Sequence, residues 1–372
     1  MGILIFVLTI AFLILVHELG HFSVARLFKV KVEEFACGFP PRIWSKKVGK
    51  TTFSLNLIPL GGFVRLYGED GKHAKEENSY SSKTWWQKSL IGVAGVFANF
   101  VFAAIILAIG YNIGLPRMVT DYSNVSGVNT ENQIVVVEVN KDSLAEQIKL
   151  KPGDTILRIL PGNNEKTISR DQKSAFRDMD DFKANLAKYK NQEVELIIKR
   201  KGNLKTISAS FPDKNEDILG VYIVENSIYR FGFFKSLWIG ILETAKLIVY
   251  IAVSLYVLIK NLIISGQVAD FATGPVGIYY MAGGVSKLGL SYILQFIGFI
   301  SINLGIINLL PIPALDGGRI VFNVIEGIRR KPLDSRIENT IHTIGFIVII
   351  VLVILIFYRD ILRIPYYRSI FG

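Results

Sequence analysis

Two histidines and a glutamate near the end of the first apolar segment have the spacing of a metal site, in the pentapeptide HELGH at residues 17–21. Residues four apart lie ~40° around an α-helix and ~6 Å along it, so His17 and His21 can present both imidazoles to one metal ion. Neutral imidazole binds zinc well, and catalytic zinc usually has three protein ligands and a water whose pKa falls to ~7. Glu18 is the candidate general base, which takes the proton of that water and passes it to a leaving amine.

A second interpretation of this pentapeptide is a chance match containing helix-capping or core histidines. The setting disfavours it, because His17, Glu18 and His21 are the only ionisable side chains of residues 2–24. Such groups are costly within an apolar span unless they are paired, bound to metal or facing a watery cavity. The zinc interpretation is therefore preferred.

A third ligand must come from elsewhere, and the preferred candidate is Asp316, in the sequence NLLPIPALDGG at residues 308–318. Pro311 and Pro313 must interrupt a helix there, and a broken helix at membrane depth is tolerated where it lines a cavity. An Asp-Gly pair alone is more typical of a turn or a helix N-cap. Asp316 is nevertheless favoured, because it and His21 are expected at the inner ends of spans that run in the same direction. The alternatives, which follow the first span on its cytoplasmic side, are Glu33 and Glu34.

The composition indicates a membrane protein, since 51% of the 372 residues are apolar and the mean hydropathy is +0.39. A fibrous or disordered chain is excluded. The net charge of +11 is concentrated beside apolar segments, as residues 29–88 carry 11 basic and 6 acidic side chains whereas residues 116–230 carry 18 and 17. This distribution fits basic cytoplasmic loops better than a nucleic-acid groove, so we expect no nucleic-acid partner. The single cysteine, Cys37, excludes an internal disulfide.

Four uncharged or nearly uncharged stretches are long enough to cross the ~30 Å hydrocarbon core as helices. The first has no basic residue before Arg26 and is predicted to be retained rather than cleaved, with the amino terminus outside the cytoplasm. In the second, small residues at three-residue spacing would let another helix approach closely. The four predicted spans are residues 2–24, 89–116, 288–315 and 340–358.

Residues 231–264 are apolar but carry four charges, and their interpretation depends on counting crossings. The basic loop around residues 329–336 marks the end of the 288–315 span as cytoplasmic. A chain that leaves a domain outside the cytoplasm must cross the membrane an odd number of times to reach this cytoplasmic loop. The 288–315 span supplies one crossing. We therefore predict an interfacial or re-entrant helix pair at 231–264, with a third full span as the alternative.

The two remaining regions are predicted to contain strands. Residues 32–66 combine prolines and glycines with an alternating stretch at 51–58, which indicates short strands and turns. Residues 117–228 carry charges of both signs and predict a soluble α+β domain, with strands near 134–139 and 194–199 and a helix near 180–189. Within it, residues 137–159 resemble a PDZ domain.

The expected fold is thus a polytopic α-helical membrane protein of about four transmembrane helices, with a membrane-associated β-hairpin region and an inserted α+β PDZ-like domain. The expected divisions are a first membrane half at 1–116, an extracytoplasmic PDZ-like domain at 117–228, interfacial or re-entrant helices at 229–287, and a second membrane half at 288–372.

The combination of HELGH in the first span, NLLPIPALDGG in a late span and a PDZ-like insert between them resembles the site-2 protease family of intramembrane zinc metalloproteases. The resemblance covers nearly the whole chain, and the single insert is similar to the shorter bacterial members. Residues 58–64 resemble the loop that closes a membrane-associated β-hairpin, and residues 273–277 resemble the turn before the third span. One departure is that residues 95–99, GVFAN, lack the proline found in many members.

The resemblance implies zinc (Zn2+) held by His17, His21 and Asp316, with Glu18 as general base. It also implies that Asn303 and Asn308 hold the substrate backbone or the developing oxyanion. The alternative for both asparagines is an interhelical hydrogen bond.

The expected function is hydrolysis of peptide bonds within or near transmembrane segments of membrane proteins, such as anti-sigma factors or signal-peptide remnants. An unwound substrate must satisfy its freed backbone groups, and the segment 51–58 offers an edge for β-pairing unless it forms a self-contained hairpin. The resemblance further implies a bacterial inner-membrane location, an active site towards the cytoplasm, an extracytoplasmic insert that filters substrates by size, and an upstream site-1-type protease. The alternative function is a non-catalytic metal-binding membrane receptor or scaffold; a transporter is disfavoured because no inverted repeat is found.

Overall fold

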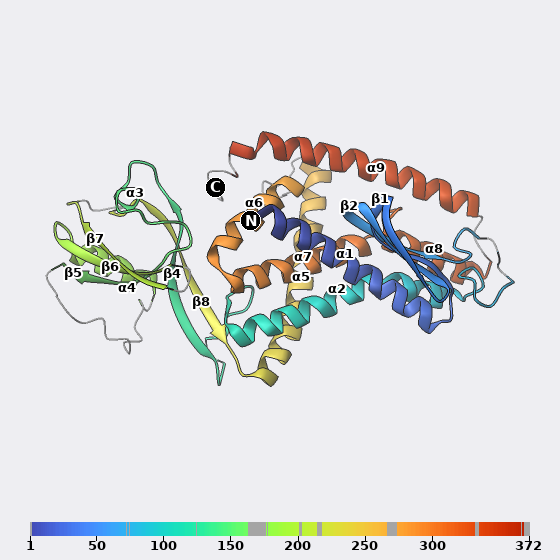
Figure 1. Ribbon diagram of the computed structural model, residues 1–372, viewed down its shortest axis with the longest axis horizontal. Helices are drawn as coiled ribbons and strands as arrows, with labels where there is room; N and C mark the ends of the chain where they lie inside the picture. The colour runs from blue at the N-terminus through green and yellow to red at the C-terminus, as the bar shows by residue number, and fades with distance from the viewer. Residues whose placement is uncertain are drawn as a thin grey trace.

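The computed structural model describes residues 2–71, 73, 75–123, 125–162, 176, 178–200, 203–213, 218–265, 274–331, 335–365 and 367. Figure 1 shows an elongated molecule with a helical part at one end and a small strand-rich domain at the other. The strand-rich domain is inserted between two long helices, which places it outside the helical part, as the change in composition predicted.

Five helices in the described part of the chain are long and apolar enough to cross a membrane. These are α1 (Gly2–Leu27), α2 (Trp85–Ile113), α5 (Phe233–Ser265), α7 (Leu290–Leu309) and α9 (Ser335–Leu362). Two shorter helices, α6 (Pro275–Leu288) and α8 (Asp316–Arg329), flank α7. Each of the four predicted spans is a helix, but α7 is shorter than predicted because the chain leaves the helix before Pro311. Of the predicted turn at 273–277, residue 273 lies outside the described residues, and Pro275 already begins α6.

The helix pair predicted at 231–264 is wrong, because α5 is one continuous helix of 33 residues. Figure 1 shows it running steeply across α2. The charges that suggested an interruption are accommodated instead: Glu243 is fully buried and accepts hydrogen bonds from the backbone N–H groups of Val119 and Thr120 and from the hydroxyl of Tyr122. Whether α5 spans the membrane or lies at its surface stays a prediction, and so does the number of spans.

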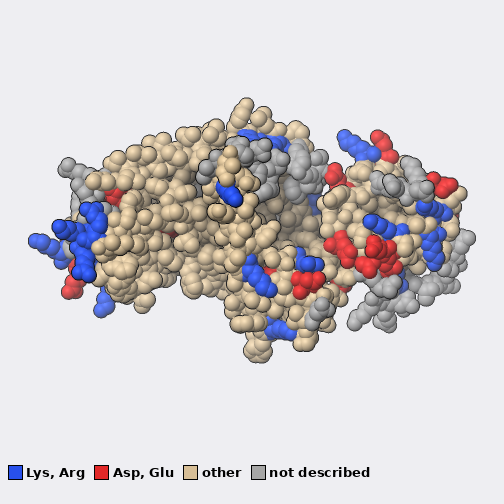
Figure 2. Space-filling model, turned by 180° about the vertical axis from the view of Figure 1, so that it is seen from behind, with Lys and Arg blue, Asp and Glu red and all other residues tan. Residues whose placement is uncertain are grey.

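The surface of the helical part agrees with a membrane setting. Figure 2 shows that Lys and Arg gather at the end farthest from the inserted domain, and that the surface next to this end is nearly free of charged side chains over a broad stretch. Charged side chains reappear on the part nearest the inserted domain and on the domain itself. An uncharged belt between two charged ends is the pattern of a protein that crosses a bilayer.

Helices α1 and α2 touch backbone to backbone, where small residues of the two helices meet. A Cβ atom added to Gly20 would lie 2.3 Å from the carbonyl oxygen of Ala94 and 2.9 Å from the Cβ of Ala98. On the same helix, Gly92 faces Ile320 of α8 and Gly95 faces the two histidines. The small residues therefore let α1 and α8 approach α2 as predicted, and they do so beside the candidate site.

Residues 32–66 form a sheet from two long strands, β1 (Val32–Val48) and β2 (Thr51–Leu66), rather than the short strands predicted. Phe35 is paired with both Val64 and Phe53, and Phe53 is also paired with Lys46. Both strands therefore bend, and their segments lie in the order 62–66, 32–37, 51–58, 42–48. The hypothesis that 51–58 offers a free edge is wrong, because residues 52–55 are paired on both sides; the alternative, a self-contained hairpin, is confirmed.

The inserted domain has the predicted α+β composition. Its six-stranded antiparallel sheet has the order β3-β8-β4-β5-β6-β7, and the predicted strands and helix lie in β4, β6 and α4. The core contains Ile156, Phe182, Leu196 and Phe211, all nearly inaccessible to solvent. The elements are β3 (Leu115–Pro116), β4 (Asn129–Val139), α3 (Leu144–Gln147), β5 (Thr155–Pro161), α4 (Met179–Lys188), β6 (Glu193–Arg200), β7 (Asn203–Ser210) and β8 (Val221–Arg230). The likeness to a PDZ domain stays a prediction.

Candidate metal centre

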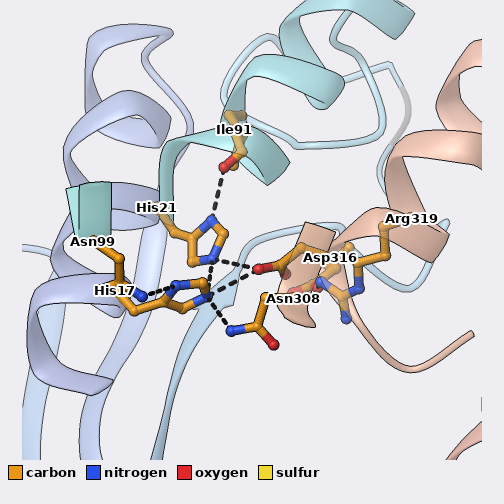
Figure 3. Close-up of polar contacts among 8 residues, drawn as sticks. His17, His21, Ile91, Asn99, Asn308, Asp316 and Arg319 are labelled. Carbon is orange, nitrogen blue, oxygen red and sulfur yellow. Dashed lines mark hydrogen bonds and ion pairs between the residues drawn. The ribbon is translucent and has the colours of Figure 1, made fainter. Parts of the chain in front are cut away.

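Three ligand-type atoms from two distant parts of the sequence converge inside the helical part, as Figure 3 shows. The Nε2 atom of His17 lies 2.9 Å from Oδ2 of Asp316 and 3.1 Å from Nε2 of His21. The third side of this triangle, from His21 Nε2 to Asp316 Oδ2, is 3.2 Å. Within the described residues, these three side chains form the group that could hold a metal ion. The structure therefore brings together the two histidines of HELGH and the preferred third residue.

Helix α2 provides the space for the imidazoles. A Cβ atom added to Gly95 would lie 2.3 Å from Nε2 of His21 and 2.8 Å from Cε1 of His17. Such distances are closer than atoms of a packed protein approach, so no side chain larger than a hydrogen fits at this position. The glycine thus allows both rings to turn towards Asp316.

Asp316 is positioned by a tight loop between α7 and α8. It is the first residue of α8, and the chain before it turns through Ala314, whose φ of 77° lies in the left-handed region. A Cβ atom on Gly317 would lie 2.1 Å from the carbonyl oxygen of Leu310, and one on Gly318 would lie 2.5 Å from that of Ile312. The two glycines after the aspartate are therefore required for the loop to close against the start of α8.

The outer nitrogens of both histidines have partners. The Nδ1 atom of His21 is 2.7 Å from the carbonyl oxygen of Ile91, so it carries the hydrogen and leaves the Nε2 lone pair directed at the centre. The Nδ1 atom of His17 is 3.3 Å from the side-chain amide of Asn99. The Oδ1 atom of Asn99 is buried and has no hydrogen-bond partner among the described residues. Turning that amide by 180° would give His17 Nδ1–H an acceptor and free its Nε2 for a metal.

The donor set fits zinc. Ligand atoms ~2.0–2.1 Å from a zinc ion at tetrahedral angles are roughly 3.3–3.4 Å apart, close to the three sides of the triangle formed by His17, His21 and Asp316. Two imidazole nitrogens and one carboxylate oxygen are also a ligand set that catalytic zinc uses, with one position left for water. Burial raises the pKa of Asp316, but its contacts with His17 and His21 outweigh burial and hold that pKa below its ordinary value. The carboxylate is therefore ionised, as a ligand must be.

The other candidate residues lie at different distances from the centre. Glu18 faces β2, since a Cβ atom on Gly62 would lie 3.1 Å from its Cγ. The Nδ2 atom of Asn308 is 3.5 Å from Nε2 of His17. Asn303 instead donates a hydrogen bond of 2.8 Å to the carbonyl of Phe299 in its own helix, and the described part of the chain shows no hydrogen bond from it to the histidines.

The alternative third ligands are engaged elsewhere. Glu34 is buried and accepts hydrogen bonds from Arg42 at 2.5 Å and from Ser54 at 2.7 Å. Glu33 lies 3.6 Å from Lys31. Sequence reasoning did not assign a contact to Asn99; the signal was an amide in the middle of an uncharged span, which predicts a buried polar partner without saying which one.

Known proteins match along nearly the whole chain. The sequence profile described as peptidase family M50 matches residues 5–352. A candidate zinc metalloprotease of Clostridium perfringens is 36% identical over 368 residues, which is 97% of this chain and 99% of the relative. The regulator of sigma-W protease RasP of Bacillus subtilis is 28% identical over 451 aligned positions, covering 97% of this chain and 98% of RasP. A candidate zinc metalloprotease of Fusobacterium nucleatum is 31% identical, with 97% and 98% covered.

The match includes both halves of the metal centre, which stand almost 300 residues apart in the chain and meet in the structure. A profile that spans both, together with full-length relatives named as zinc metalloproteases, agrees with the ligand geometry. The chain belongs to peptidase family M50, the site-2 protease family.

Proposed function

We propose that this protein is an intramembrane zinc metalloprotease that hydrolyses peptide bonds within or near transmembrane segments of other membrane proteins. The observation that carries the proposal is the triangle of His17, His21 and Asp316, with sides of 2.9–3.2 Å, inside a set of helices long and apolar enough to span a membrane. Glu18 lies beside it on the same helix turn as His17.

Each side chain has a separate role in this proposal. His17, His21 and Asp316 hold zinc, which when bound lowers the pKa of a water to ~7 and polarises a carbonyl group. Glu18 takes a proton as the water oxygen attacks the peptide carbonyl carbon, and returns it to the amine when the C–N bond breaks. Asn308 donates its amide hydrogen to the carbonyl oxygen as negative charge develops there. Asn303 is proposed to bind the substrate backbone at a greater distance from the metal centre.

A substrate helix must unwind before its carbonyl can be attacked, because every backbone group in it is internally bonded. The sheet of β1 and β2 is the nearest place for such an extended strand to pair. Since 51–58 is internal, the substrate is proposed to pair with the outer segment 62–66, which is joined to 32–37 on its other side. Gly62 supports this pairing, because it places the outer segment beside Glu18: a Cβ atom added to Gly62 would lie 3.1 Å from Cγ of Glu18.

The substrates are proposed to be single-span membrane proteins, such as anti-sigma factors, or signal-peptide remnants in a bacterial inner membrane. The name of the B. subtilis relative, a regulator of sigma-W protease, supports the first class. The metal centre is proposed to lie towards the cytoplasm, and the insert, proposed to be PDZ-like, outside. There it would admit substrates already shortened by a site-1-type protease.

Glu18→Gln tests this function. The amide keeps the size of the side chain and leaves the three ligands intact, so the purified variant is expected to retain about one zinc per chain. Cleavage of a single-span reporter should fall by ~10²–10⁴-fold, the usual contribution of a general base. Undiminished cleavage would show that Glu18 is not the base. Zinc binding by the wild type without cleavage of any reporter would favour the receptor or scaffold.

A further inference from the structure

A histidine on the last helix contacts the loop that carries Asp316. The Nδ1 atom of His342, in α9, accepts a hydrogen bond of 2.9 Å from the backbone N–H of Ala314. Ala314 stands two residues before Asp316, in the turn between α7 and α8. The sequence drew no attention to His342, since a lone histidine in an apolar helix has no spacing pattern.

The accepted N–H belongs to the most unfavourable backbone position of this loop. Ala314 has a φ of 77°, and a residue with a Cβ atom rarely adopts the left-handed region. Such a conformation persists only where the surroundings hold it. The hydrogen bond from Ala314 to His342 is a contact that can hold it.

Helix α9 also packs against the residue before Ala314. A Cβ atom on Gly345 would lie 2.4 Å from the Cβ of Pro313 and 2.6 Å from its carbonyl oxygen, so the backbone of α9 presses directly on the loop. The ring of Phe322, in α8, meets the His342 ring edge-on at 5.2 Å and 66°. The imidazole is thus fixed between the loop and α8.

The protonation state of the ring follows from this contact. Because Nδ1 accepts, the neutral ring carries its hydrogen on Nε2. Nε2 is buried without a hydrogen-bond partner in the described part of the chain, and the closest carboxylate oxygen, Oε1 of Glu338, is 4.0 Å away. The polar contact that His342 makes is therefore directed at the loop.

We propose that His342 is a positioning residue for the metal centre: by accepting the N–H of Ala314 it holds the loop in the conformation that points the Asp316 carboxylate at His17 and His21. This rests on the proposed function, in which these three residues hold zinc. Under this proposal, zinc affinity also depends on a residue of the last helix, 26 positions after Asp316.

Three substitutions of His342 separate positioning from packing. The Oδ1 atom of an asparagine reaches nearly the position of the histidine Nδ1, so His342→Asn keeps an acceptor for Ala314. The amide of His342→Gln reaches the position of Nε2 instead, and His342→Leu fills the space without any acceptor. Phe346→Ala, an exposed position one turn further along α9, is the matched control.

The measurement is zinc affinity of the purified full-length protein in detergent, by competition with a chelator. His342→Gln and His342→Leu are expected to bind zinc ~10–100-fold more weakly, as when the outer partner of a metal ligand is lost. His342→Asn and Phe346→Ala are expected to stay close to the wild type. Hydrogen exchange of a peptide covering residues 310–318 gives a second readout without zinc, and it should accelerate in the Gln and Leu variants alone.

The outcomes are distinguishable. If the wild type binds no zinc, the proposed function fails. If the wild type binds zinc and all four variants match it, or if the Asn variant is as weak as the Gln variant, the positioning role of His342 is refuted. A drop in melting temperature that is equal in Asn, Gln and Leu, with unchanged zinc affinity, would assign His342 to packing.

Discussion

Two clusters of buried polar side chains in this molecule differ in how their lone pairs are satisfied. At the junction with the inserted domain, both carboxylate oxygens of Glu243 receive donors, namely two backbone N–H groups and a hydroxyl. At the metal centre, two imidazole nitrogens and a carboxylate oxygen converge within 3.2 Å of one another. Because Nδ1 of His21 donates to Ile91, the inner nitrogen of the ring, Nε2, carries a lone pair. That lone pair points at the lone pairs of the neighbouring acceptor atoms.

This difference separates a structural cluster from a group that could hold a cation. Buried acceptors are stable when matched with donors, whereas acceptors that face one another need a positive charge between them. Burial of charge alone would have ranked Glu243, which is completely inaccessible, above Asp316. The contrast leads to measurable differences between variants, which are expected to decrease in size in the order Asp316, Glu243, Gly95 and Asp121.

Removing a ligand should have the largest effect. Asp316→Ala is expected to reduce bound zinc from about one per chain to nearly none. Reporter cleavage should fall by at least ~10³-fold, because a metal ion lowers such a barrier by several kcal/mol. Metal analysis and a cleavage assay measure both. Glu33→Gln is the control for the alternative ligand and should change neither; loss of zinc in that variant would move the third ligand to Glu33.

Removing the structural carboxylate should affect stability and not zinc. Glu243→Ala leaves the N–H groups of Val119 and Thr120 and the hydroxyl of Tyr122 without their acceptor. The free energy of unfolding should fall by on the order of 3 kcal/mol. Denaturant unfolding in detergent, followed with a zinc titration, checks this. Glu243→Gln keeps one oxygen acceptor and should lose less; a large change in zinc affinity would contradict the separation of the two clusters.

A methyl group beside the imidazoles should weaken the metal centre selectively. Gly95→Ala places a Cβ atom 2.3 Å from His21 Nε2, so the ring must move. We expect roughly tenfold weaker zinc binding, similar to the effect of misplacing a ligand through its outer partner. Gly92→Ala, one turn earlier on α2, meets only the side chain of Ile320, with Cγ1 at 3.1 Å and Cδ1 at 3.7 Å, and should bind zinc like the wild type. Equal affinities in both variants would mean that the rings have more room than the structure indicates.

The smallest effect should appear in acid, at the junction with the inserted domain. Hydrogen bonds from the backbone N–H of Ser123 and from the Tyr229 hydroxyl lower the pKa of Asp121 to about 2. A carboxyl whose pKa is depressed in the folded state stabilises it above its ordinary pKa near 3.8, and this contribution is lost as the pH falls towards 2. Asp121→Asn should therefore show less loss of stability between pH 5 and pH 3 than the wild type. Parallel unfolding curves for the two proteins would disprove the linkage.

Much of this architecture could be predicted from the sequence because its signals are local or repeated. Apolar length identified four helices, and the HELGH spacing identified the pair of imidazoles. Asp316 was reached by comparing the direction of two spans. The helix pair predicted at 231–264 came from counting membrane crossings, and it was wrong because the segment is one continuous helix. Its buried carboxylate, Glu243, is matched by a loop more than 120 residues earlier in the chain, which the local sequence does not reveal.

The remaining contacts of the site depend on tertiary structure, so no periodic pattern in the sequence predicts them. Asn99 and His342 have no partner pattern in their own helices, because the groups they contact, His17 and Ala314, lie in other elements. The internal position of 51–58 in its sheet follows from bends in β1 and β2, which alternation of side chains does not reveal. Spacing along the chain can therefore find candidate metal ligands and still miss the residues that contact them.

The contact between Gly20 and Ala94 bears on which part of the candidate metal centre is held most firmly. Since no side chain separates the two helix backbones there, a shift of α1 against α2 would bring their atoms into collision, so we expect the two imidazoles to keep their places beside Gly95. Asp316 instead follows the left-handed turn at Ala314, at the start of α8. The distance between the carboxylate and the imidazoles is therefore expected to depend more on the conformation of that turn than on the fit of α1 against α2.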